Sequence, residues 1–119
     1  MRSMVRIGQI ASVCTISILL SGPVRAQANT ATATAPDLID GLQAGWVLDR
    51  MLVFPHSVPL TNPGGCGTLT NGYIINETDP GRKTFYALLL GALLNGRQVQ
   101  FVIQGCFEDR PRIVSVSIH

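Results

Sequence analysis

The pattern of hydrophobic positions from residue 80 to residue 96 predicts one helix. Asp79 is the expected N-cap, Pro80 suits the first helical position, and Asn95-Gly96 supplies a left-handed stop. One side of the helix carries an apolar stripe wide enough to face a core, made of Phe85, Leu88, Leu89, Ala92 and Leu93. The other side is apolar as well, which is unusual for the helix of a small domain.

This second apolar side is a candidate subunit interface, made of Ala87, Leu90, Gly91 and Leu94. A helix that is apolar all round is normally buried all round. We therefore expect another copy of the chain to cover it, or else the N-terminal segment around Leu38, Ile39 and Leu42. The remaining alternative is a set of exposed leucines without a role, which are common on protein surfaces.

Five short segments are predicted to be strands, because their apolar residues alternate or form runs bounded by Gly and Pro. They span residues 46–54, 56–60, 73–76, 97–104 and 113–118. In the fourth segment Val99, Phe101 and Ile103 should point inward, and the glutamines between them outward. In the last segment Val114 and Val116 should face the core.

The predicted order is three strands, one helix and two strands in a single domain. A helix between the third and fourth of five short strands is the order of an OB-fold, a partly open barrel. We therefore expect an α+β or mainly β fold, an OB-like five-stranded small barrel with the helix closing one end. A split α+β sandwich is the alternative.

Residues 1–26 have the three-part pattern of a secretory signal peptide: early arginines, an apolar run and then small residues. Cleavage is expected after Ala26 or after Ala28. The apolar run is shorter than a membrane-spanning helix and is interrupted by Ser and Thr. We expect export to the periplasm or the extracellular space, with no membrane span in the mature chain.

The rest of the chain divides into a leader and one domain. Residues 29–44 begin with an Ala/Thr-rich repeat and are predicted to be a flexible leader, with a short helical turn within 36–45. Residues 45–119 would form the single OB-like domain.

Removal of the signal peptide reverses the balance of charge. Three of the nine Lys and Arg residues leave with it, whereas all seven Asp and Glu residues stay, so six basic residues face seven acidic ones. The mature chain has no basic stripe, which argues against nucleic acid as a partner.

Cleavage also leaves two cysteines, Cys66 and Cys106. An even number in an exported chain favours a disulfide over two free thiols or a metal pair, because no metal-binding spacing surrounds them. Such a bridge would close a loop of about 40 residues and stabilise a small core.

The segments "GGCG" to "YIIN", "TFYALLLGALLNG", "RQVQFVIQGC" and "PRIVSVSI" resemble a group of small exported bacterial proteins of uncharacterised function. More distantly, they are similar to the OB-fold B subunits of pentameric bacterial toxins of the subtilase-cytotoxin and typhoid-toxin type. The resemblance covers residues 57–118. It implies an oligomer whose helices line a central channel, and a surface that binds a glycan or a protein.

Candidate chemistry is sparse. His56 and His119 are the only histidines, and no serine or cysteine has the surroundings of a nucleophile, so we expect neither an enzyme nor a metal or cofactor site. Weak candidates for ligand contacts are Trp46, His56, Asn71 and Tyr73, because aromatic faces and amides suit sugars and peptide edges. Two functions remain: an exported binding module for a glycan or protein, or a structural protein of the bacterial envelope that self-associates through its helix.

Overall fold

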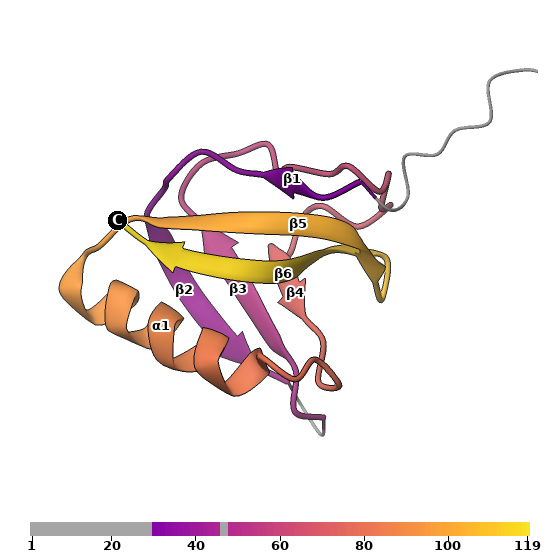
Figure 1. Ribbon diagram of the computed structural model, residues 1–119. Helices are drawn as coiled ribbons and strands as arrows, with labels where there is room; N and C mark the ends of the chain where they lie inside the picture. Colours follow the sequence, from indigo (N-terminus) through magenta and orange to yellow (C-terminus); the bar gives the residue numbers. More distant parts are fainter. Residues whose placement is uncertain (1–29, 46–47) are drawn as a thin grey trace, which may run out of the picture.

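The computed structural model describes residues 30–45 and 48–119 (Figure 1). Over these residues it contains one helix and six strands. In chain order they are β1 (Thr32–Ala33), β2 (Ile39–Ala44), β3 (Met51–Pro55), β4 (Tyr73–Ile75), α1 (Arg82–Asn95), β5 (Val99–Phe107) and β6 (Arg110–Ile118). The predicted signal peptide and Trp46 lie outside the described residues.

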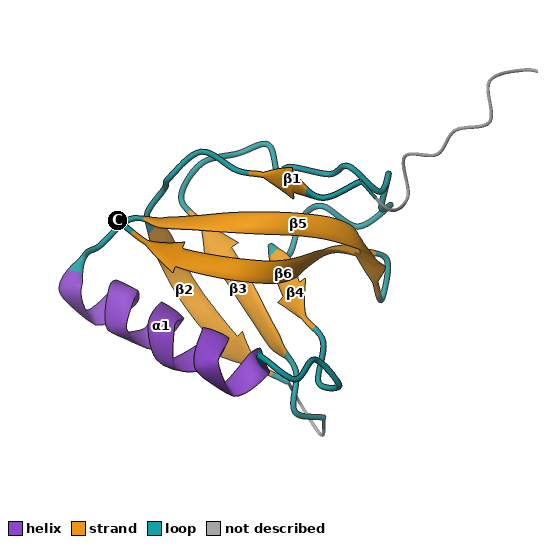
Figure 2. Ribbon diagram, in the orientation of Figure 1, coloured by secondary structure: helices purple, strands orange, loops and turns teal. Residues whose placement is uncertain are grey.

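The strands form one mixed sheet in the order β1-β5-β6-β4-β3-β2. The β4–β6 pair is parallel and the other neighbours are antiparallel. The consecutive strands β1 and β2 therefore lie at opposite ends of this order. The short connection between them touches the sheet once more, where Asp37 bridges Val99 at the start of β5. In Figure 2 the β5–β6 hairpin lies across β2, β3 and β4, with α1 below.

The prediction of a mainly β fold with one helix is confirmed, whereas the five-stranded barrel is not. The sheet has six strands and is not closed, and α1 follows the fourth strand rather than the third. The difference arises in residues 29–44, which were predicted to be a leader with a helical turn. Residues 32–33 and 39–44 of this segment are strands instead.

Two further strand predictions need correction. The segment 46–54 was expected to be one strand, but β3 begins only at Met51, after a bend in which Gly45 N–H donates to the Arg50 carbonyl. Residues 56–60 are not a strand. Around them, the backbone N–H groups of Ser57 and Thr61 donate to the Asp37 carboxylate and the Tyr73 hydroxyl rather than to a neighbouring strand.

The helix begins at Arg82 and ends as predicted. Gly96 adopts the left-handed conformation at φ 60°, and its N–H donates to the Ala92 carbonyl. The N-cap prediction was wrong, because the N-cap residue is Gly81 and no side chain caps this end. The buried Asp79 carboxylate instead accepts Arg112 Nη2 at 2.5 Å and Nε at 3.3 Å, which ties the start of α1 to β6.

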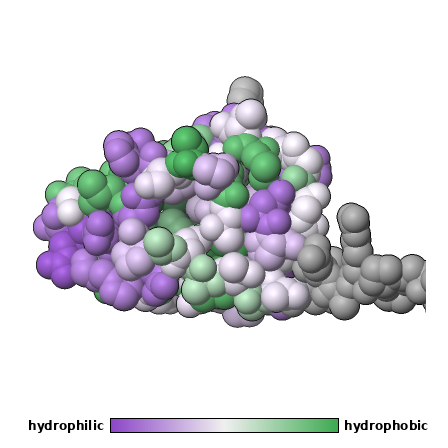
Figure 3. All heavy atoms as spheres, turned by 90° about the horizontal axis from the view of Figure 1, so that it is seen from above, coloured by the Kyte–Doolittle hydropathy of each residue, from purple (hydrophilic) through white to green (hydrophobic). Residues whose placement is uncertain are grey.

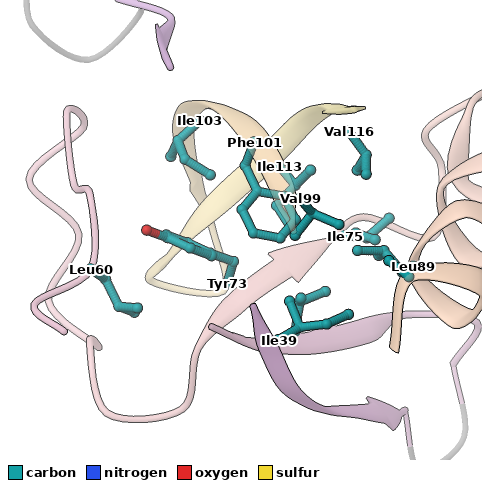
Figure 4. Close-up of a cluster of buried hydrophobic side chains, with 12 residues drawn as sticks. Ile39, Leu60, Tyr73, Ile75, Leu89, Val99, Phe101, Ile103, Ile113 and Val116 are labelled. Carbon is teal, nitrogen blue, oxygen red and sulfur yellow. The ribbon is translucent and has the colours of Figure 1, made fainter. Parts of the chain in front are cut away.

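The core lies between the β5–β6 hairpin, strands β2 to β4 and one side of α1 (Figure 4). Val99, Phe101 and Ile103 are buried as predicted, and so are Leu89 and Ala92 of the helix. Other members of the core come from the N-terminal strands and the central ones, including Ile39, Val53, Tyr73 and Ile75.

The orientation of β6 was predicted only in part. Val116 is buried as expected, but the other inward residue is Ile113, which is fully buried, and Val114 is only half-buried. The cause is a shift of register, since Ile103 pairs with Ile113 whereas Val102 pairs with Ser115. The extra residue in β6 forms a bulge, which breaks the simple alternation of sides.

The predicted disulfide is confirmed. The sulfurs of Cys66 and Cys106 are 2.00 Å apart and their Cα atoms 5.8 Å apart. The bridge fastens the loop before β4 to the end of β5. Within the described part of the chain, no helix is long and apolar enough to cross a membrane.

Candidate ligand pockets

The four candidate ligand residues do not form one site. Tyr73 lines a pocket and His56 stands beside two of its wall residues, Pro55 and Ser57. Asn71 lies elsewhere, against Arg110. With the Asn71 amide turned so that its nitrogen donates to the Thr70 carbonyl, its oxygen accepts a hydrogen bond from Arg110 Nη2 at 3.2 Å. Trp46 is outside the described residues.

The first pocket, named here the Tyr73 pocket, has a volume of about 160 Å³. It lies between the segment 34–37 and the segment 55–61. Its floor is formed by Tyr73 and Phe101, whose ring centroids are 5.5 Å apart. Its apolar walls include three prolines, which are Pro36, Pro55 and Pro59. Because proline and buried aromatic side chains have few accessible conformations, this pocket is largely preformed.

Hydrogen bonds hold the polar side of the Tyr73 pocket. The Asp37 carboxylate accepts the backbone N–H of Ser57 at 2.6 Å and that of Leu38 at 2.9 Å, which joins the two walls. Thr61 N–H donates to the Tyr73 hydroxyl at 2.8 Å. The phenolic proton of Tyr73 has no acceptor among the described residues, so it is available to an oxygen of a ligand. Figure 4 shows the hydroxyl pointing to the loop that carries Leu60.

His56 carries a positive charge more readily than an isolated histidine does. Its Nδ1 lies 2.9 Å from Asp40 Oδ1. This hydrogen bond, and then the charges of Asp40 and Asp37, raise the pKa of His56 above its usual 6.5. Both side chains are exposed, so the pair is open to water. On the face seen in Figure 3, apolar and hydrophilic patches alternate.

The second pocket, named here the Arg110 pocket, has a volume of about 80 Å³. It is lined by residues from the end of β2, the start of β3 and the β5–β6 turn. Two arginines and one glutamate supply its charge: Arg50, Arg110 and Glu108. No pattern in the sequence pointed to this cluster, because its members are distant in the chain and only the tertiary fold brings them together.

The described residues hold no group of three His, Cys, Asp or Glu side chains that could bind a metal ion. Within the described residues, the hydrogen-bond partner of the His56 ring is the Asp40 carboxylate. Neither observation tests whether the chain is an enzyme, so the expectation that it is not one stays a prediction.

The second apolar side of α1 is exposed. Leu90 retains 52% and Leu94 75% of their accessible surface. Ala87 is also exposed, and a Cβ placed on Gly91 would meet no atom within 4 Å. The N-terminal segment does not cover this side, since Ile39 and Leu42 pack against the core and Leu38 is itself exposed.

Comparison of the chain with protein-family models, with curated proteins and with solved structures finds no significant match.

Proposed function

We propose that this chain is an exported, non-catalytic binding module that holds part of a glycan or a protein in the Tyr73 pocket. The observation that carries the proposal is the pocket itself: an aromatic floor, proline walls, and polar groups fixed by hydrogen bonds. Apolar concave sites with a few positioned polar groups are the usual form of ligand sites.

The proposal includes an OB-like barrel. It is supported by the strand order β2-β3-β4-β6-β5, the parallel β4–β6 pair, and the helix between β4 and β5. Strand β1 and the Asp37 bridge would then be the first half of a long, bent first strand that also pairs with β5. The resemblance to the toxin B subunits also implies an OB-fold.

The size of the Tyr73 pocket limits the ligand. A volume of about 160 Å³ suits one sugar ring or one side chain of a peptide, with the rest of the ligand outside the pocket. The Tyr73 hydroxyl and the hydroxyls of Ser57 and Thr61 suit a ligand with several oxygen atoms, which both classes provide.

An assembly function is the second candidate, favoured by the exposure of Leu90 and Leu94. In this proposal the side of α1 that also includes Ala87 and Gly91 packs against another copy of the chain. Self-association and ligand binding are compatible, as they are in the toxin B subunits that the sequence resembles.

The test is a glycan and peptide array probed with the mature chain and two tyrosine variants. Tyr73→Phe removes the hydroxyl from the pocket, whereas Tyr86→Phe removes a hydroxyl that donates to the Asp49 carbonyl away from it. We expect a ligand that wild type and Tyr86→Phe retain and that Tyr73→Phe binds roughly tenfold more weakly, the effect of one lost hydrogen bond. Equal binding by all three proteins, or no ligand on either array, would refute the proposal.

A further inference from the structure

The Arg110 pocket contains a cationic group whose hydrogen bonding is incomplete. Arg110 Nε is buried and has no hydrogen-bond partner within the described residues. Its Nη2 donates to Asn71, but a guanidinium has five N–H donors in a planar fork. Because an unpaired buried donor on a cation is costly, such groups are normally satisfied by an anion or by water.

A second guanidinium lies in the same pocket and is already paired. Arg50 forms an ion pair with Glu108, and both side chains are partly buried, at 23% and 34% exposure. Gln43 and Gly45 of the neighbouring strand end complete the polar lining, and Leu52 adds an apolar wall. Two guanidiniums against one carboxylate leave the pocket with one net positive charge.

The turn that carries Glu108 is fixed from outside the pocket. Glu108 and Asp109 both have positive φ angles, 49° and 60°, as the two central residues of a two-residue hairpin turn between Phe107 and Arg110 require. The Asp109 carboxylate accepts Gly67 N–H at 2.8 Å, and its carbonyl accepts Thr68 N–H at 2.8 Å. The disulfide-linked loop therefore holds the β5–β6 turn in place, and this turn positions Glu108 opposite Arg50.

We propose that the Arg110 pocket is a binding site for a carboxylate group. One net positive charge matches one negative charge, and a planar carboxylate matches the donor fork of Arg110, with Arg50 as the second cation. A phosphate dianion would exceed the charge of the pocket and is larger than a carboxylate. The site is distinct from the Tyr73 pocket, with which it shares no lining residue.

The probe is acetate, titrated into the ¹⁵N-labelled mature chain with the ionic strength held constant by chloride. We expect the Arg110 Nε–Hε signal and the Gly45 amide signal to shift along a saturating curve, with a Kd of about 1–10 mM for so small a ligand. Inorganic phosphate serves as the comparison. Shifts that do not saturate, or tighter binding of phosphate than of acetate, would overturn the assignment.

Three variants separate binding from structural damage, with the Gly45 amide as their readout. Arg110→Lys keeps the charge but loses the fork, and should weaken acetate binding at least about tenfold. Glu108→Gln removes the competing carboxylate from Arg50 and should tighten acetate binding several-fold. Structural damage to the pocket would weaken acetate binding instead. Arg97→Lys makes the same substitution at an arginine whose Nε donates to the His119 carbonyl, and should change nothing. Unchanged binding in Arg110→Lys, or weaker binding in Glu108→Gln, contradicts the proposal.

Discussion

At the scale of single residues, a few polar contacts join segments that are distant in the sequence. Asp79 is one example, because its carboxylate binds Arg112 in a two-point arrangement instead of capping α1. An Asp before Pro and a helical run predicts an N-cap, and nothing nearby in the sequence announces an arginine on β6. The contact depends on the parallel pairing of β4 with β6, which local patterns do not encode.

The Asp79–Arg112 pair gives a stability prediction. Asp79→Asn should lower the free energy of unfolding by about 2 kcal/mol, because it leaves Arg112 without its carboxylate in a partly buried position. Urea unfolding of Asp79→Asn, Arg112→Gln and the double variant measures the coupling between the two side chains. If the pair acts as described, the double variant should lose at least about 1 kcal/mol less than the sum of the two single-variant losses. Additive losses would show that the groups act independently.

The His56–Asp40 pair gives a pH prediction. Since the folded-state pKa of His56 is raised above 6.5, the pair stabilises the fold fully below that pH. The contribution is lost as the pH rises through the raised pKa. NMR titration of the histidine ring should show a pKa above 6.5 that falls toward it in Asp40→Asn. A pKa of His56 that does not respond to Asp40→Asn would contradict this assignment.

The disulfide gives the largest stability prediction. Replacement of both Cys66 and Cys106 by Ala should destabilise the domain by about 4 kcal/mol, because the unfolded chain regains the freedom of a loop of 40 residues. Chemical denaturation of wild type and the double variant measures the difference. A loss below about 1 kcal/mol would mean that the bridge constrains the unfolded chain little.

At the scale of elements, strongly periodic segments were predictable and weakly patterned ones were not. The helix, β4 and β5 have clear apolar periods and clear stops, and the structure has them within a few residues of the predicted limits. Strand β2 contains Gly41 and two polar residues, Asp40 and Gln43, so no alternation marks it. Its strand conformation comes from pairing with β3 and from burial of Ile39.

The pockets were the least predictable feature for the same reason. Tyr73 and His56 could be named as ligand candidates from their residue types alone. Asp37 and Pro36 could not, because they lay in a segment expected to be flexible. Likewise, Arg50 and Arg110 are brought together only by the tertiary fold.

Gly91 gives a prediction about α1. Gly91→Ala should raise the free energy of unfolding by up to about 1 kcal/mol, since alanine favours the helix and, among the described residues, the added Cβ meets no atom of another element within 4 Å. Thermal unfolding at low protein concentration measures this gain. A destabilised variant would show that an unrecognised contact fills the space above Gly91.

The exposed side of α1 gives a prediction about assembly. If copies of the chain pack through it, Leu90→Glu with Leu94→Glu should yield a folded but smaller species, because like charges would be desolvated at the contact. Light scattering after size exclusion separates the outcomes. A wild-type chain that is already monomeric at high concentration would remove the assembly function.

At the scale of the whole molecule, the two pockets and the exposed helix side lie on one framework held by the disulfide. The N-terminal segment is part of this framework, because β1 pairs with β5 and Asp37 joins both β5 and Ser57. The Tyr73 pocket therefore exists only when residues 34–37 are in place. Its walls come from chain positions that only the completed fold brings together.

The measurement that tests the central claim most directly is NMR mapping of the mature chain with the strongest binder from the arrays. We predict saturating shifts centred on Thr61, Tyr73 and Phe101, which line the Tyr73 pocket, and saturation at roughly tenfold higher ligand concentration in Tyr73→Phe but not in Tyr86→Phe. Shifts centred on α1 around Leu90 and Leu94, or the absence of any binder, would contradict a binding module that works through this pocket.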